Sequence, residues 1–126
     1  TLKIKILNEG NGRIFAVFES IQYFAHGRRV NAGIGERYFS FASTMPKTAL
    51  GRLSVLTRRH LSKIFKEKPG LGINLDKQLQ ELMSRLNCEC LPAVFTLDDR
   101  ACFAIGYYHQ RQNDFQNEQT QKEDTK

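Results

Sequence analysis

The segment from Pro46 to Lys68 constrains this chain more than any other, because it predicts one long helix with two different faces. Its sequence is PKTALGRLSVLTRRHLSKIFKEK. At about 100° per residue, one stripe along this helix is apolar and suited to a protein core. That stripe contains Ala49, Leu50, Leu53, Leu56, His60, Leu61 and Ile64. For His60, a core or interface position is the main interpretation, and a ligand role is the alternative.

A second stripe on the same helix, about a third of a turn away, is basic. It contains Arg52, Arg59, Lys63 and Lys66. At the helical rise these cations form a straight row about 21 Å long, which we call the basic row. A helix that is apolar on one side and basic on another is typical of a scaffold that holds a nucleic-acid backbone. The alternative is a solvated basic face without a ligand.

Other cations in the same half of the chain extend this prediction. Residues 1–68 hold 13 Lys/Arg and 4 Asp/Glu, a net charge of +9, whereas residues 69–126 hold 6 and 9, a net charge of −3. This asymmetry indicates one face for a polyanion and another for protein neighbours or solvent. We therefore add four candidate nucleic-acid-binding residues outside the row: Arg28, Arg29, Lys47 and Arg58.

Apolar periodicity predicts an all-α, single-domain helical bundle of about five helices. The 126 residues are enough for one core. Helices are expected at 12–26, 32–43, 46–68, 71–86 and 96–112. Residues 1–11 alternate like a strand without a hairpin partner and are expected to form an extended arm, and the polar residues 113–126 a disordered tail. The expected domains are therefore an arm at 1–11, a bundle at 12–112 and a tail at 113–126.

The fifth expected helix carries apolar residues on two sides. Its predicted core stripe contains Leu97, Ala101, Ala104, Ile105 and Tyr108. The opposite row contains Arg100, Phe103, Tyr107 and Arg111. Aromatic side chains that alternate with arginine suit a subunit interface, which we predict, or the stacking of nucleobases.

No active site, cofactor or metal site is expected from the motifs. Cys88, Cys90, Cys102 and His109 lack the usual spacing of zinc ligands, and no phosphate-binding loop is present. An odd number of cysteines without a signal peptide is typical of the reducing cytoplasm. No apolar run approaches the length of a membrane span. The chain begins at Thr1, which fits either removal of an initiator Met or cleavage of a longer parent.

Three segments together resemble a known family: RYFSFASTMPKTALGRLSVLTRRHLSKI, KPGLGINLDKQLQELM and FTLDDRACFAIGYYHQRQ. They are similar to the C-terminal region of the large subunit of the type I-C CRISPR Cascade complex, a region that is also made separately as the small subunit. The resemblance covers roughly residues 12–112. The size of the chain favours the free-standing small subunit.

The resemblance implies a non-catalytic helical bundle, present in more than one copy, that steadies target DNA once the R-loop opens. The implied partners are the Cascade backbone subunits, the large subunit, other copies of the chain, crRNA and target DNA. R-loop formation is a nearly balanced exchange of strands, so modest contacts to the DNA backbone can favour it. Two alternatives are a structural spacer that makes no contact with DNA and a metal-dependent nuclease.

Overall fold

The computed structural model describes residues 2–27, 34–85 and 94–124, and it places side chains for most of them. These residues form five helices and no strand. The helices are α1 (Leu2–His26), α2 (Ile34–Thr44), α3 (Pro46–Glu67), α4 (Pro69–Ser84) and α5 (Leu97–Asp124). The predicted all-α bundle of about five helices is therefore confirmed.

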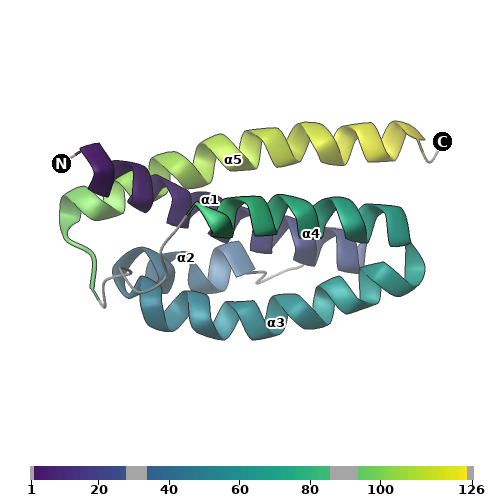
Figure 1. Cartoon of the computed structure of the whole chain (residues 1–126), viewed down its shortest axis with the longest axis horizontal. Helices are drawn as coiled ribbons and strands as arrows, with labels where there is room; N and C mark the ends of the chain where they lie inside the picture. The colour runs from purple at the N-terminus through teal and green to yellow at the C-terminus, as the bar shows by residue number, and fades with distance from the viewer. Residues whose placement is uncertain (1, 28–33, 86–93, 125–126) are drawn as a thin grey trace.

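Helix α1 runs through the middle of the bundle. It packs most extensively on α5 and also contacts α2, α3 and α4. Helices α3 and α5 lie along opposite edges of the molecule, and no contact joins them among the described residues (Figure 1). The consecutive residues 14–18 of α1 are all buried, as a helix covered on several sides requires.

Helices α1 and α5 are parallel and cross with their backbones in contact (Figure 1). A Cβ atom added at Gly12 would overlap the carbonyl oxygen of Phe103, and one added at Gly106 would overlap the carbonyl oxygen of Glu9. Only glycine permits this approach, because every other residue carries a Cβ atom. The crossing therefore depends on one glycine from each helix.

The centre of the bundle is aromatic. The ring centroids of Phe15 and Phe103 are 5.8 Å apart, and those of Phe39 and Tyr107 are 4.9 Å apart. The tilted ring arrangements are the ones that aromatic pairs prefer. The rings of Phe103 and Phe95 are 6.0 Å apart, so the segment before α5 also closes on this core.

The prediction of an extended arm at residues 1–11 is corrected by the structure, because α1 is helical from Leu2 onward. The alternating pattern of LKIKIL and the glycines favoured an extended chain, but packing on α5 overrides these local preferences. Asn8 is buried, and its Nδ2 atom donates a hydrogen bond of 2.8 Å to Oδ1 of Asp99. This contact and the glycine crossing extend the helix into the predicted arm.

The prediction that the last helix ends at residue 112 is also corrected, because α5 continues to Asp124. Asp114 lies beyond the predicted end of the helix and is buried. Its Oδ1 accepts hydrogen bonds from Gln110 at 3.0 Å and from Gln78 of α4 at 3.3 Å. The residues that follow are rich in Gln, Glu and Lys, which are good helix formers despite their polarity.

Candidate nucleic-acid interface

Helix α3 carries the basic row, and a proline marks each of its two ends. Pro46 occupies the first turn, where its missing N–H removes no hydrogen bond. The helix ends before Pro69, and the backbone N–H of Lys68 donates to the carbonyl of Ile64 at 2.7 Å. The buried residues of α3 are Pro46, Ala49, Leu50, Leu53, Thr57, Leu61 and Ile64. The apolar stripe predicted from the sequence therefore faces the core, with Leu56 and His60 partly buried at its margin.

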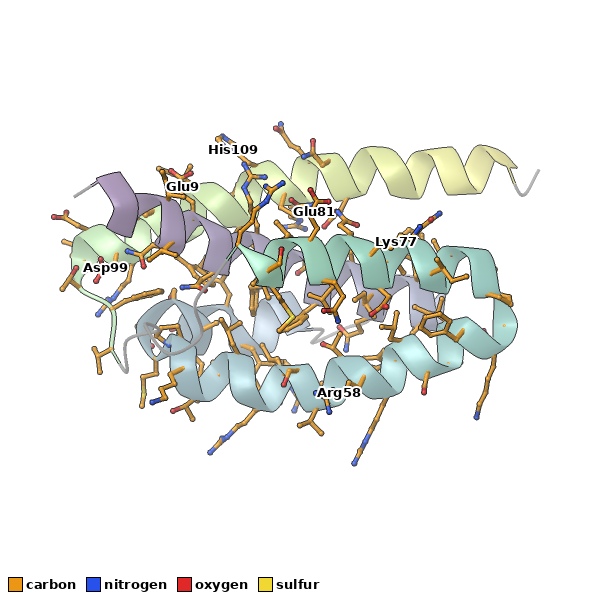
Figure 2. All side chains as sticks on the ribbon, viewed as in Figure 1. Glu9, Arg58, Lys77, Glu81, Asp99 and His109 are labelled. Carbon is orange, nitrogen blue, oxygen red and sulfur yellow. The ribbon has the colours of Figure 1, made fainter. Side chains whose placement is uncertain are left out.

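The four members of the basic row are all exposed: Arg52, Arg59, Lys63 and Lys66. None of them forms a salt bridge with an acidic residue in the part of the chain that the structure describes. Figure 2 shows long side chains with nitrogen tips that project from α3 away from the rest of the bundle. The row is therefore available to a ligand.

One residue of the row is held in place by an aromatic ring. The guanidinium carbon of Arg52 lies 5.6 Å from the centroid of the Phe41 ring of α2, within the range of a cation–π interaction. The contact fixes the direction of the side chain without neutralising its charge. Val55, which lies between Arg52 and Arg59 on this face, is 56% exposed and gives the row one apolar contact point.

Two of the four additional candidates lie on the exposed surface of α3, and the other two lie outside the described residues. Lys47 and Arg58 are exposed on α3, away from the main row, and Figure 2 labels Arg58 near the middle of the helix. Arg28 and Arg29 lie outside the described residues. The structure therefore adds Lys47 and Arg58 to the basic surface of α3.

Three arginines elsewhere in the bundle are engaged with neighbours. Arg85 pairs with Glu81 at 2.7 Å, and Nε of Arg111 lies 3.6 Å from Oε1 of Glu19. Arg13 donates a hydrogen bond of 3.3 Å to Gln110. Arg13 and Arg85 line a polar cleft of about 620 Å³ between α1, α4 and α5, together with Glu81. The cations of α3 are thus less compensated than those of this cleft.

His60 lies beside the basic row but does not add to its charge at neutral pH. Burial lowers the pKa of His60, and the nearby charges of His26 and Lys63 lower it further. The rings of His60 and His26 lie 5.3 Å apart, edge to face. His60 is therefore a neutral residue at the margin of the core, in line with the main interpretation of the sequence.

The predicted phase of α5 is wrong by about half a turn. Phe103 is 0% exposed and Tyr107 is 3% exposed, so the two aromatic residues of the predicted interface belong to the core. The two arginines of that row, Arg100 and Arg111, are exposed at its edges. The stripe predicted to face the core instead faces outward, with Leu97 78% exposed.

A polar cluster explains why Tyr107 is accepted in the core. The Tyr107 hydroxyl donates to the Glu19 carboxylate, whose oxygens lie at 2.9 and 3.0 Å, and Arg111 donates to the hydroxyl oxygen at 3.4 Å. Burial and the adjacent negative charge of Glu19 raise the pKa of Tyr107 well above its ordinary value. The phenol therefore stays protonated and ties α5 to α1. No local sequence signal identifies this contact, because Glu19 and Tyr107 are far apart in the chain.

Metal ligands do not cluster in the described part of the chain, where no group of three His, Cys, Asp or Glu side chains is placed to hold an ion. Cys102 is a half-buried free thiol, whereas Cys88 and Cys90 lie outside the described residues. No helix among the described residues is long and apolar enough to cross a membrane.

The fold and the charges define a helical-bundle protein with one exposed basic helix. The sequence model of the family described as CRISPR-associated protein (Cas_Csd1) matches residues 10–115. The match covers most of the chain, so the chain belongs to this CRISPR-associated family and is a Cascade-associated protein. This finding confirms the resemblance seen in the sequence. No curated protein matches the chain.

Proposed function

We propose that this chain is the non-catalytic small subunit of a type I-C Cascade complex and that it holds a nucleic-acid backbone with α3. The observation that carries the proposal is the contrast between the basic row of α3 and the paired arginines of α4 and α5. The basic row is exposed and has no acidic partner among the described residues, whereas Arg85 and Arg111 are paired. Such a row contributes a salt-sensitive attraction to phosphates that does not depend on base sequence.

The rigidity of α3 suits this role. Its apolar face is buried against α1 and α4, so the cations are mounted on a helix that does not need to form on binding. A preformed row loses less conformational entropy when it binds than cations on a flexible segment. In the assembled complex, crRNA or target DNA would lie along this row, and the contacts would stabilise the open R-loop.

The test is to reverse the charge at the centre of the row in the assembled complex. The variant Arg59→Glu/Lys63→Glu should weaken binding of every target DNA sequence alike and make the dependence of log K on log salt shallower. Four phosphate contacts to a single strand give a slope of about −3 for the row, and the variant should lose about half of it. Binding can be measured by fluorescence anisotropy at several salt concentrations.

The matched control carries the same charge change elsewhere. Arg37 on α2 and Lys77 on α4 are exposed and lie outside the basic surface of α3 (Figure 2 labels Lys77). The variant Arg37→Glu/Lys77→Glu should therefore weaken binding much less than the α3 variant. Equal weakening by the two variants would reject α3 as the specific contact, and unchanged binding by both would reject nucleic-acid contact.

A structural spacer is the second candidate function, and the exposed apolar stripe of α5 favours it. Reconstitution of the complex with and without this chain separates the two functions. A more stable particle with unchanged DNA affinity supports the spacer, whereas a gain in DNA affinity supports the nucleic-acid contact.

In this role the chain has no catalytic activity, and it acts in the cytoplasm together with Cascade backbone and large subunits. Metal analysis of the purified chain and a nuclease assay with DNA and RNA substrates test the first statement. Cleavage that stays with the chain through purification and disappears when metal ions are chelated would overturn it.

A further inference from the structure

The polar cleft between α1, α4 and α5 is the one large hollow whose lining the basic row does not share. Its floor is α1, and its two walls are α4 and α5. Among the described residues, no Cα atom of α4 lies within 8 Å of a Cα atom of α5, so the walls stand apart. The cleft has a volume of about 620 Å³, within the range of about 300–1,000 Å³ for small-molecule sites. Its polar lining consists of Arg13, Gln78, Glu81, Arg85, Gln110 and Asn113.

Arg13 lies at the floor of the cleft and has no carboxylate partner in the described part of the chain. Its side chain is half-buried, and Nη1 donates a hydrogen bond of 3.3 Å to Oε1 of Gln110. A neutral amide does not balance the charge, and a guanidinium group carries five N–H donors. A half-buried cation of this kind is stabilised by an anion that supplies the counter-charge.

A network of buried amides holds Arg13 in position. Gln110 is only 5% exposed, and its Nε2 donates to Oδ1 of Asp114 at 3.0 Å. Gln78, from the opposite wall, donates to the same oxygen at 3.3 Å. Asp114 is buried and does not itself line the cleft. With its N–H group used in this way, Gln110 turns its carbonyl oxygen to Arg13. The guanidinium is therefore preorganised, which lowers the entropic cost of binding a ligand.

Arg85 supplies a second cation from the wall of the cleft. Its Nη2 lies 2.7 Å from Oε1 of Glu81, which Figure 2 labels on the side of α4 toward α5. The side chains of this pair are 68% and 65% exposed, so the pair is weak and easily exchanged for another partner. Two guanidinium groups and one carboxylate give the lining a net charge of +1. The cleft therefore favours an anion.

We propose that the cleft binds a small organic anion, about the size of a mononucleotide, that carries a phosphate or carboxylate group. Arg13 and Arg85 hold the anionic oxygens, because the planar fork of a guanidinium group matches both kinds of group. The Asn113 amide and the Gln78 carbonyl bond the polar body of the ligand. Along α4 the lining spans residues 78–85, about 10 Å of helix, which suits a small molecule rather than a long chain. No lining residue belongs to α3, so the inference does not rest on nucleic-acid binding.

The first test is isothermal titration calorimetry of the full chain with three probes. Adenosine monophosphate carries a phosphate and a polar body, citrate carries carboxylates, and inorganic phosphate has no body. At least one of the first two should bind saturably with a dissociation constant of about 1 mM or less, and inorganic phosphate at least about tenfold more weakly. The tighter of the two organic probes identifies the anionic group. Failure of both to saturate the chain, or equal affinity for inorganic phosphate, would overturn the proposal.

The second test removes each guanidinium group in turn. Arg13→Gln and Arg85→Gln should each weaken binding of the tighter probe at least about tenfold, because each removes charge-assisted hydrogen bonds. Arg85 is exposed, so its variant keeps the fold, and circular dichroism checks Arg13→Gln. The matched control is Arg37→Gln, on the exposed surface of α2 outside the cleft, and it should leave the affinity unchanged. The basic-row variant Arg59→Glu/Lys63→Glu should retain it as well. An equal loss in either control would indicate general attraction to a basic protein and would refute the site.

Discussion

Helices α3 and α5 form opposite edges of the bundle, and they differ in what their outer sides carry. The outer side of α3 is basic, and that of α5 is apolar. The sequence correctly predicted which side of α3 is buried but reversed the sides of α5. Hydrophobic periodicity identifies the buried side only where the other side is polar, as it is on α3. On α5 both sides are apolar, so packing against α1 determines which side is buried.

The contact that decides the orientation of α5 is the glycine crossing with α1. Gly106 lies between Phe103 and Tyr107, and it brings that side of α5 directly onto α1. The large aromatic residues next to the crossing then fill the core on either side of it. The outer side of α5 remains uncovered because the crossing with α1 buries the inner side.

The largest expected effect comes from a substitution that blocks the glycine crossing. Gly106→Val places side-chain atoms where the Glu9 carbonyl lies, so α1 and α5 must separate along their whole contact. We expect a loss of more than about 3 kcal/mol in the free energy of unfolding, and therefore a largely unfolded chain at 37 °C. Urea unfolding followed by circular dichroism measures this loss.

Gly51 provides the control for that experiment. It is exposed in the middle of α3, and a Cβ atom added there meets nothing within 4 Å. Gly51→Ala should raise the free energy of unfolding by roughly 0.5–1 kcal/mol, because glycine is unfavourable inside a helix. Equal stability of Gly106→Val and the wild-type chain would contradict the observed crossing.

The next effect separates the two sides of α5. Phe103→Ala removes a fully buried ring and should cost about 3–5 kcal/mol, whereas Leu97→Ala removes an exposed side chain and should stay within about 0.5 kcal/mol. The phase predicted from the sequence gives the opposite order. Chemical denaturation of the two variants measures both values. A larger loss for Leu97→Ala would restore the original prediction.

Local signals in the sequence identified most helix boundaries. Helix α3 begins at Pro46 and α5 at Leu97, close to the expected starts at 46 and 96, whereas α4 begins at Pro69, two residues before its expected start at 71. The signals failed where long-range contacts determine the structure. Asn8 and Gly12 are poor helix formers, yet α5 supplies the hydrogen bond and the close approach that keep this segment helical. The same applies to Asp114, whose partner Gln78 lies on another helix.

The basic row was predictable for a related reason. Its four cations depend only on helical phase and on the apolar stripe of the same helix, and both are local properties of α3. The pairing of Arg111 with Glu19 was not predictable, because those residues meet only through the packing of α5 on α1. A row of cations on one helix can thus be found from the sequence, whereas ion pairs between residues of two different helices cannot.

A smaller effect is expected at the start of α5, where Thr96 and Asp99 cap each other. The Asp99 carboxylate accepts a hydrogen bond of 2.9 Å from the Thr96 backbone N–H, and the Asp99 N–H donates to the Thr96 hydroxyl at 3.2 Å. This reciprocal pair is a capping box. Asp99→Ala should lower the free energy of unfolding by about 1 kcal/mol, since it also removes the acceptor for Asn8. Asp98→Ala, which removes the same charge from the same turn, should cost less.

The cap also makes stability depend on acid. The hydrogen bond from the Thr96 backbone lowers the pKa of Asp99 below its ordinary value of 3.8, and bonds from the Thr96 and Asn8 side chains act in the same direction, although burial opposes them. A carboxyl with a lowered pKa in the folded state stabilises the fold above pH 3.8, and this contribution is lost as the pH falls through the folded value. Thermal unfolding between pH 2 and pH 5 should therefore vary less with pH in Asp99→Ala than in the wild-type chain.

The smallest expected effect lies on α3, at His60. The folded state lowers the pKa of His60 from 6.5, mainly through burial and then through the charges of His26 and Lys63. The unfolded chain therefore binds a proton before the folded one does as the pH falls below 6.5, and stability decreases in that range. His60→Gln should flatten the dependence of the melting temperature on pH between about 5 and 6.5, whereas His26→Gln should flatten it only in part, because burial of His60 remains. If His60→Gln left the slope unchanged, His60 would bind its proton equally in the folded and unfolded chains, and the lowered pKa assigned to it would be wrong.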